Sequence, residues 1–299
     1  MNKGIVSAFA AYILWGVFPI YFKIIHVVPP TQILAHRIVW SFLLLLVVLL
    51  VKKEFKNWSK VITWRTLLIY TIAALLLGCN WLTYVWSVNA GFVVEASLGY
   101  FINPLVSVLL GVILLREKLR PMQWVPVVLA AIGVLYLTLS YGSLPWIALT
   151  LAFSFGIYGL MKKISPLDSL YGLSLETAIL FLPATLFLIF SESQGVGSFG
   201  HQGVLIDILL ALAGVISVIP LILFSIGVRS TPLSTIGLIQ YITPTLQFLI
   251  GTLMYHETFS TERLIGFCII WLALIIFSIE NFSAARKARI SGSIPVNQG

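Results

Sequence analysis

The sequence predicts an all-α polytopic membrane protein with ten transmembrane helices in two inverted five-helix repeats. Three observations favour this fold. Hydrophobic residues make up 60% of the 299 residues and charged residues only 9%, against about 25% in a soluble domain; the mean hydropathy is +1.05. Apolar runs of about 20 residues, the length that crosses a bilayer, recur along the whole chain. A constant offset of 140 residues relates the two halves.

Each expected span is one apolar run, separated from the next by polar or basic residues. In chain order the runs cover residues 4–22, 32–51, 66–87, 92–115, 122–140, 143–161, 170–190, 206–228, 232–254 and 263–280. The first run is too long for the core of a signal peptide and lacks a small-residue cleavage site, so we expect a retained helix. The longest connections, 52–65 and 191–205, are too short for a soluble domain.

The basic residues sort to one side of the expected membrane. Fifteen of the eighteen Lys and Arg residues lie on the side of the N-terminus: Lys3, Lys52, Lys53, Lys56, Lys60, Arg65, Arg116, Lys118, Arg120, Lys162, Lys163, Arg229, Arg286, Lys287 and Arg289. The positive-inside rule then places both termini in the cytoplasm. Because topology explains the net charge of +8, the charge does not indicate a nucleic-acid partner.

An internal repeat supports the inverted arrangement. The offset of 140 residues pairs Leu98 with Leu238, Ile102 with Ile242, Pro104 with Pro244, Leu109 with Leu249, Gly111 with Gly251, Glu117 with Glu257, Gly16 with Gly156, Lys23 with Lys163 and Ile24 with Ile164. Five spans in each copy force the second copy to enter from the opposite side, which suits alternating access. We therefore expect repeats at 1–140 and 141–282, followed by a disordered cytoplasmic tail at 283–299.

Six segments carry a resemblance to a known family: AYILWGVFPIYFK, HRIVWS, GCNWLTYVWSVN, EASLGYFINPL, FSFGIYGLMKK and STIGLIQYITPTLQFL. Over residues 4–282 the chain resembles the EamA-type drug/metabolite transporter superfamily and, within it, the RarD branch, whose members are labelled chloramphenicol-sensitive proteins. The resemblance implies a bacterial inner-membrane carrier that moves small organic molecules, usually outward, through a central cavity lined by both halves. It does not identify chloramphenicol as the cargo.

Two prolines at repeat-related positions are expected to kink their spans. Pro104 lies in the middle of twenty uncharged residues between Glu95 and Arg116, and Pro244 is its counterpart in the ninth span. Each removes a backbone donor and clashes with the preceding turn. The two kinks either shape a midplane site, where Asn103 and Thr243 would satisfy freed carbonyls, or serve packing alone.

Ionisable residues within spans are costly and are candidates for gating or proton coupling. His36 and Arg37 lie near the outer end of the second span, at the expected level of Glu95 in the fourth. Glu95 either pairs with Arg37 or binds substrate or a proton; His36 either titrates or makes an ordinary helix contact. Glu176, the repeat counterpart of His36, is either an inner gate or a partner of Lys162 or Lys163.

Aromatic and amide side chains form a second constellation, in spans one, three, four and nine. A cavity for drug-like molecules has apolar and aromatic walls with a few polar groups. The candidate substrate-binding residues are Trp15, Asn80, Trp81, Tyr84, Tyr100, Asn103, Gln240 and Tyr241. For each amide, hydrogen bonding between helices is the alternative.

Signatures of other activities do not stand out. Cys79 and Cys268 lie inside expected spans and are interpreted as small apolar fillers. His256-Glu257 lacks a second histidine for a zinc site, and we find neither a phosphate-binding glycine loop nor a G-x-S-x-G elbow. We expect neither an enzyme nor a bound cofactor or metal.

The expected function is secondary transport of a small-molecule substrate, surrounded by membrane lipids and driven by a proton or a counter-substrate. A channel-like facilitator and a non-transport membrane sensor are the alternatives; a channel needs no inverted repeat, and a sensor normally carries a soluble signalling segment. The cargo, the coupling, the direction and the choice between monomer and homodimer stay open at this point.

Overall fold

The computed structural model describes residues 3–90, 92–141, 144–254 and 261–290, and all regular secondary structure in these residues is helical. The elements are α1 (Lys3–Gly16), α2 (Phe18–Ile24), α3 (Pro30–Val51), α4 (Phe55–Lys60), α5 (Trp64–Asn89), α6 (Val93–Ile113), η1 (Pro121–Gln123), α7 (Trp124–Tyr141), α8 (Trp146–Ile164), α9 (Ser169–Ser193), α10 (Val204–Ser230), α11 (Leu233–Gln240), α12 (Ile242–Leu249), η2 (Ile250–Met254) and α13 (Thr261–Ile290).

The chain is an all-helical, multi-pass membrane protein. Among the described residues, seven helices are long and apolar enough to cross a bilayer, and two shorter apolar helices cover Leu98–Ile113 and Leu264–Glu280. Large apolar side chains cover the outer surface; Leu75, Leu182 and Ile275, for example, are all more than half exposed. A surface of this kind is unfavourable in water but matches lipid tails.

Two of the expected spans are interrupted helices. The first expected span contains α1 and α2, which are separated at Val17. In the ninth expected span, α11 ends at Gln240 and α12 begins at Ile242. Pro244 lies in the first turn of α12, where backbone N–H groups have no acceptor within the helix, so the missing N–H of proline costs no hydrogen bond. By contrast, α6 is one continuous helix that contains Pro104. The ninth span is thus interrupted before its proline, at Tyr241, whereas the fourth is not interrupted at Pro104.

The boundaries outside the membrane differ from expectation in two places. The connection 52–65 contains a short helix, α4, rather than a simple loop. Residues 283–290, which we expected to be disordered, form the last turns of α13; 291–299 lie outside the described residues. Cys79 and Cys268, interpreted from the sequence as fillers, are both exposed on the outside of the bundle.

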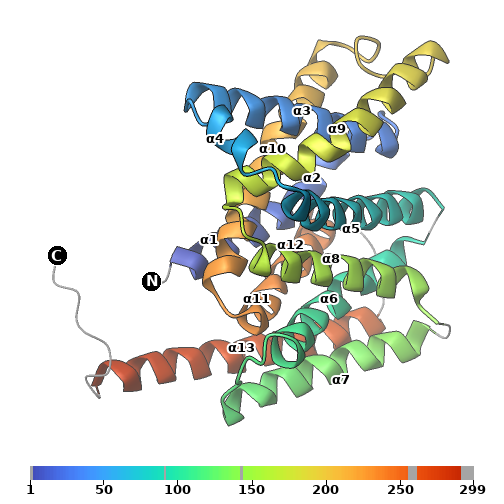
Figure 1. Ribbon diagram of the computed structural model, residues 1–299. Helices are drawn as coiled ribbons and strands as arrows, with labels where there is room; N and C mark the ends of the chain where they lie inside the picture. The colour runs from blue at the N-terminus through green and yellow to red at the C-terminus, as the bar shows by residue number, and fades with distance from the viewer. Residues whose placement is uncertain (1–2, 91, 142–143, 255–260, 291–299) are drawn as a thin grey trace.

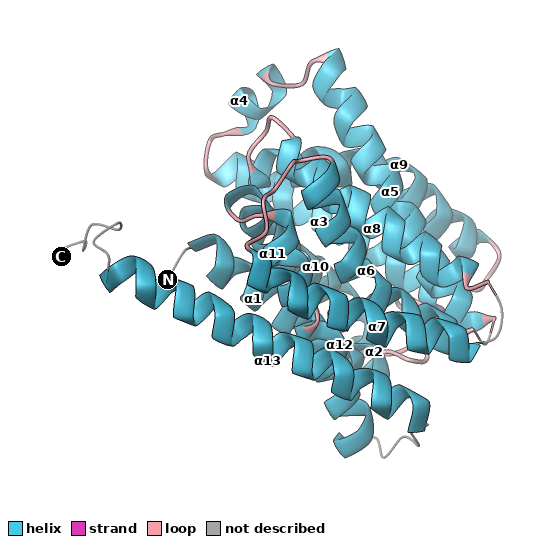
Figure 2. Ribbon diagram, turned by 90° about the horizontal axis from the view of Figure 1, so that it is seen from below, coloured by secondary structure: helices cyan, strands magenta, loops and turns pink. Residues whose placement is uncertain are grey.

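The helix ends sort to two ends of the molecule. In Figure 1 the N-terminus, α4 and the C-terminal end of α13 lie on the left, whereas the connections between α2 and α3 and between α9 and α10 lie on the right. Figure 2 shows α13 running along α7, and its last turns project beyond the bundle. We call the end that carries the N-terminus and α4 the basic end, because basic residues gather there. The end that carries the α2–α3 and α9–α10 connections is called the opposite end.

Close helix contacts are made at small residues. A Cβ added at Gly16 of α1 would lie 2.7 Å from the Leu246 side chain of α12, and one added at Gly156 of α8 would lie 2.7 Å from Val106 of α6. Glycine therefore allows α1 to approach α12 and α8 to approach α6. One buried apolar cluster joins α1, α3, α5 and α8 to α11, and another joins α6, α7 and α8 to α11 and α13.

Candidate functional site

A cavity of about 600 Å³ lies between the helices and reaches the surface at the opposite end. Lys23 and His26, beside the connection from α2 to α3, are exposed and line its mouth. Seven of the eight residues proposed from the sequence as substrate-binding line its wall: Trp15, Asn80, Trp81, Tyr84, Tyr100, Asn103 and Gln240. Helices α1, α3, α5, α6, α8 and α11 thus all contribute to one space.

Tyr241, the eighth candidate, is not among the cavity-lining residues. Its side chain is fully buried, and its hydroxyl donates a hydrogen bond to the carbonyl oxygen of Phe101 at 3.1 Å. This bond joins the break between α11 and α12 to α6, so the tyrosine fixes helix packing. Tyr241 therefore does not belong to the wall of this cavity, and its role in substrate binding stays a prediction.

Aromatic rings form the inner wall of the cavity. The Trp15 ring lies 5.5 Å from Tyr12 and 5.7 Å from Phe155, which also line the cavity. Tyr84 and Tyr100 contact each other edge to face at 5.8 Å on another part of the wall. The prediction from sequence missed Tyr12, Phe18, Phe22 and Phe155. The first three share the first span with Trp15 and could have been found there, whereas Phe155 lies in the sixth span, for which no candidate was predicted. The aromatic wall suits a ligand that carries a ring.

The wall amides Asn80 and Gln240 both line the cavity and form hydrogen bonds between helices, the two alternatives that the sequence left open. Asn80 donates to the Leu151 carbonyl at 2.8 Å and to Ser154 Oγ at 3.0 Å, tying α5 to α8. Gln240 accepts a hydrogen bond from the Tyr12 hydroxyl at 3.4 Å. The buried amide oxygen of Asn103 has no hydrogen-bond partner among the described residues. Helix-to-helix bonding by Asn80 and Gln240 therefore fixes the positions of two polar groups on the wall.

The proline-related positions differ in what they face. Thr243 and Pro244 line the cavity, and Thr243 donates to the Tyr12 carbonyl at 2.8 Å. Pro104 does not line it; a Cβ at Gly237 would lie 2.5 Å from the Pro104 carbonyl oxygen, so α11 packs directly on α6 here. Only Pro244 contributes to the shape of the cavity wall, whereas Pro104 lies in a helix contact.

Arg37 is the cation of the cavity wall. Its Nε donates to Ser217 Oγ of α10 at 2.9 Å. Its guanidinium carbon lies 4.2 Å from the Trp81 ring centroid and 5.7 Å from the centroids of Phe18 and Phe22. The expected partner Glu95 lies in the first turn of α6, and its side chain is outside the described residues. Aromatic faces and one hydroxyl hold the guanidinium.

His36 does not share the environment of its neighbour. It is 7% exposed, and its ring lies 5.3 Å from Phe199, in the connection between α9 and α10. It is not among the residues that line the cavity. His36 and Arg37 therefore face different neighbours, as consecutive residues of a helix point about 100° apart. Whether they share a level with Glu95 stays a prediction, because the side chain of Glu95 lies outside the described residues.

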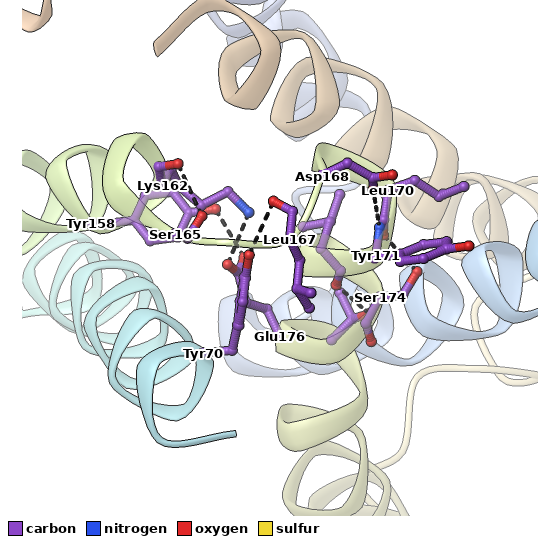
Figure 3. A network of polar contacts seen from close by, with 12 residues as sticks. Tyr70, Tyr158, Lys162, Ser165, Leu167, Asp168, Leu170, Tyr171, Ser174 and Glu176 are labelled. Atoms are coloured by element: carbon purple, nitrogen blue, oxygen red, sulfur yellow. Dashed lines mark hydrogen bonds and ion pairs between the residues drawn. The ribbon is translucent and has the colours of Figure 1, made fainter. Parts of the chain in front are cut away.

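Toward the basic end, an aromatic cluster and an ion pair follow the cavity. Phe155 of the cavity wall lies 5.8 Å from Tyr158, whose hydroxyl donates to Glu176 at 3.1 Å. Lys162 Nζ lies 2.9 Å from the other carboxylate oxygen of Glu176, and both side chains are almost fully buried. Figure 3 shows Tyr158 and Lys162 of α8 pointing toward Glu176 of α9. The pairing with Lys162 that the sequence left open is observed.

A second set of polar contacts joins the connections at the basic end. Glu117 accepts hydrogen bonds from the backbone N–H groups of Leu233 and Ser234 at 2.6 and 2.9 Å and from Ser234 Oγ at 2.6 Å. Lys163 donates to the carbonyls of Val228 and Thr231. These contacts hold the α6–α7 connection on the first turn of α11 and α8 on the end of α10. Charge-assisted hydrogen bonds thus tie the connections together at the basic end.

Outside the membrane, the α3–α4 connection is fastened to α9. Tyr171 donates its hydroxyl to Glu54 at 2.6 Å, and Asn57 donates to the same carboxylate oxygen at 2.8 Å. Both hydrogen bonds lower the pKa of the Glu54 carboxyl because they favour its charged form, and the bond from Tyr171 has the larger effect. Arg229 donates to the Ser165 carbonyl at 3.0 Å and to the Leu167 carbonyl, so the α8–α9 connection is held as well.

Comparisons with known proteins agree on one family. The model of the EamA-like transporter family matches residues 2–139 and again 144–279. An uncharacterized transporter of Bacillus subtilis, YojE, is 44% identical, covering 96% of this chain and 97% of that protein. Protein RarD of Salmonella typhi is 41% identical and covers 96% of this chain and 98% of that protein. A solved crystal structure has the same fold, with a TM-score of 0.70 at 17% identity, covering 93% of this chain and 98% of that one.

Proposed function

Because the chain belongs to the EamA-like transporter family, we propose that it is a secondary carrier that exports small organic molecules across the bacterial inner membrane by alternating access. The family is one of transporters rather than enzymes. The observation that carries the proposal is the cavity of about 600 Å³, whose wall combines residues from before and after position 140 and whose lining includes the exposed residues Lys23 and His26. Such a space suits a drug-sized solute.

Alternating access requires two halves that can repack, and residue-level contacts support an internal repeat. The contact of Gly16 with Leu246 and that of Gly156 with Val106 are related by the same offset of 140 residues in both partners. Phe101 and Tyr241, which are related by that offset, contact each other. We therefore propose ten spans in two inverted repeats, 1–140 and 141–282, with 283–299 as the C-terminal extension.

The charge distribution supports an orientation. Lys52, Lys53 and Lys56 lie beside α4 at the basic end, the end that also carries the N-terminus. We propose that this end, with both termini, faces the cytoplasm. The conformation described here then opens outward, and Glu176 with Lys162, together with Glu117, belongs to the closed cytoplasmic gate. An exporter would load its cargo after this gate opens.

The energy source is proposed to be a gradient of protons or of a counter-substrate. Glu95 and His36 are the proposed coupling residues, since a proton carrier within a span must be an ionisable side chain that can exist uncharged. The remaining proposed partners are the cargo itself, the membrane lipids and, in the assembled state, a second copy of the chain in a homodimer. Neither nucleic acid nor a nucleotide is part of the proposal.

Transport by inside-out vesicles tests the function. Vesicles with and without the protein receive a mixed metabolite extract plus chloramphenicol, with and without a proton gradient, and mass spectrometry reads their contents. We expect saturable, protein-dependent accumulation of at least one solute, with Trp81→Ala lowering the flux by about tenfold through loss of a cavity wall. Trp64→Ala is the matched control, because Trp64 lies on the same helix and is 79% exposed.

The alternatives predict different results. A channel-like facilitator would give flux that rises linearly with solute concentration and does not depend on the gradient. A membrane sensor would give no flux at all with folded, inserted protein. Equal saturable flux in Trp81→Ala and wild type would also contradict the proposal, because it would place the pathway outside this cavity.

A further inference from the structure

The wall of the cavity holds one cation, Arg37, whose side chain has no carboxylate partner among the described residues. No Asp or Glu is among the described residues that line the cavity. Arg37 is not ion-paired in the described part of the chain: its polar contact is the hydroxyl of Ser217. A buried cation in an apolar wall normally requires an anion.

The contacts of Arg37 leave one side of the guanidinium for a ligand. Nε is occupied by Ser217, and the guanidinium carbon lies over the rings of Trp81, Phe18 and Phe22. The two terminal nitrogens make no hydrogen bond to a described residue. A planar guanidinium with its terminal nitrogens unoccupied matches the two oxygens of a carboxylate, which it can bind through two parallel hydrogen bonds.

The surrounding wall indicates what the carboxylate is attached to. Tyr84, Tyr100 and Trp81 from two helices line the same cavity as Arg37, and Trp15 with Phe155 adds a further pair of rings to the wall. An aromatic cage can also bind organic cations, but here Arg37 already occupies the face of Trp81 at 4.2 Å and would repel a second positive charge. The cage therefore favours an uncharged ring.

We propose that the cargo is a small organic monoanion, a carboxylate joined to an aromatic or apolar ring, with Arg37 binding the carboxylate and the aromatic wall binding the ring. This inference rests on the proposed function and names the substrate class of the same site. Lys23 at the mouth adds positive potential along the path of the anion. One cation deep in the wall fits one negative charge better than the two of a phosphate monoester.

Binding to the purified full-length protein in detergent tests the inference without knowledge of the natural cargo. Phenylacetate, phenylacetamide and phenethylamine share a ring and a short chain and differ in charge. Intrinsic tryptophan fluorescence reports binding, because Trp15 and Trp81 lie in the wall. We expect wild-type protein to bind phenylacetate at least about tenfold more tightly than the amide or the amine.

Variants assign the preference to a residue. Arg37→Gln should bind the carboxylate and the amide equally, and Arg37→Lys should keep part of the preference through its charge. Arg65→Gln, at an exposed position of α5, should behave as wild type. If Arg37→Gln does not fold, the comparison of the three ligands on wild-type protein still shows whether the cavity prefers a carboxylate. The inference is overturned by equal or tighter binding of the amide or amine, by a preference that survives in Arg37→Gln, or by absence of binding of all three ligands.

Failure of this inference is distinguishable from failure of the transporter proposal. Saturable, protein-dependent vesicle flux of a neutral or cationic solute, together with no preference for phenylacetate, would support the transporter proposal and contradict the proposal of an anionic cargo. Absence of saturable flux for every solute would contradict both the transporter proposal and the proposal of an anionic cargo.

Discussion

Arg37 and His36 show how one residue step changes the chemistry available to a side chain. Arg37 faces the cavity through aromatic contacts, whereas His36 packs on Phe199 near the opposite end. Because Phe199 belongs to the connection between α9 and α10, a change of charge on His36 would act on that connection first. A coupling role of His36 would therefore act through the α9–α10 connection and not by contact with cargo.

The buried pair of Lys162 and Glu176 leads to a prediction about stability. Both side chains are at most 2% exposed and lie 2.9 Å apart. Removing one partner leaves an uncompensated buried charge, so Lys162→Met or Glu176→Leu should each lower the free energy of unfolding by about 3–5 kcal/mol. The double variant should cost far less than the sum, because it leaves no buried charge. Thermal unfolding in detergent measures the coupling as a double-mutant cycle.

An exposed ion pair provides the control for this cycle. Glu192 and His201 lie 2.9 Å apart but are each 58% exposed. Glu192→Gln should change stability by less than about 1 kcal/mol, because water screens such a pair. Additive effects of the two buried replacements would show that Lys162 and Glu176 do not depend on each other.

At the scale of the helix, interruptions coincide with close approach. The break at Tyr241 lies where α11 meets α6, and the break at Val17 follows Gly16, where α1 meets α12. Breaks free backbone groups that a membrane cannot hydrate, so they occur where neighbouring helices supply partners. Thr243, which donates to the Tyr12 carbonyl, is such a partner.

The glycine contacts predict a steric effect that depends on position. A Cβ at Gly16 would lie 2.7 Å from Leu246, so Gly16→Ala should destabilise the protein by about 1–3 kcal/mol through overpacking. Combining Leu246→Ala with Gly16→Ala should restore part of the stability that Gly16→Ala loses, because the smaller side chain makes room for the added methyl group; Leu246→Ala alone is measured for comparison. At Gly78 of α5 the nearest atom would be 3.8 Å away, so Gly78→Ala should be neutral or stabilising, since alanine favours the helix. Thermal unfolding of the four variants checks this, and equal losses at both glycines would contradict the packing argument.

The contact of Glu117 with the start of α11 predicts a change in accessibility. Glu117→Gln replaces charge-assisted hydrogen bonds to Leu233 and Ser234 by weaker ones, at a cost of about 1–3 kcal/mol to the closed state. A cysteine at Ile236, which is 1% exposed, should then react faster with a thiol reagent. The measurement uses a background with Cys79→Ala and Cys268→Ala.

The matched control for this experiment is Glu192→Gln, on the opposite side of the bundle. It should leave the reactivity of the cysteine at position 236 unchanged. An unchanged rate in Glu117→Gln as well would mean that Glu117 caps α11 without holding the end closed.

For the whole molecule, the sidedness of the two ends is the prediction on which the direction of transport depends. In the same cysteine-free background, a single cysteine at Asn57 of α4 should react with an impermeant reagent only from the cytoplasmic side. One at His201 should react only from outside; both positions are exposed. The reverse pattern would invert the orientation and make the described conformation open to the cytoplasm.

The sequence alone determined the class of the molecule and the set of wall residues to a useful degree. In a bilayer every backbone polar group must be bonded within the chain, so long apolar runs can only be helices, and their positions can be read from hydropathy. Seven of the eight residues chosen for their aromatic or amide character line the cavity. Aromatic character alone does not select wall residues, since Trp64 and Phe190 are exposed and Tyr70 is buried in a helix contact; the candidates other than Trp15 share their span with an amide.

Only the tertiary structure decided how individual polar residues are used. The break at Tyr241 turns that ring onto Phe101, the rotation of α3 sends Arg37 and His36 to different neighbours, and packing of α8 on α9 buries Lys162 with Glu176. Ser217 lies 180 positions from Arg37 in the chain. Periodicity within one helix carries no information about which distant helix lies against it, so the partner of a polar side chain follows from helix packing and not from local sequence.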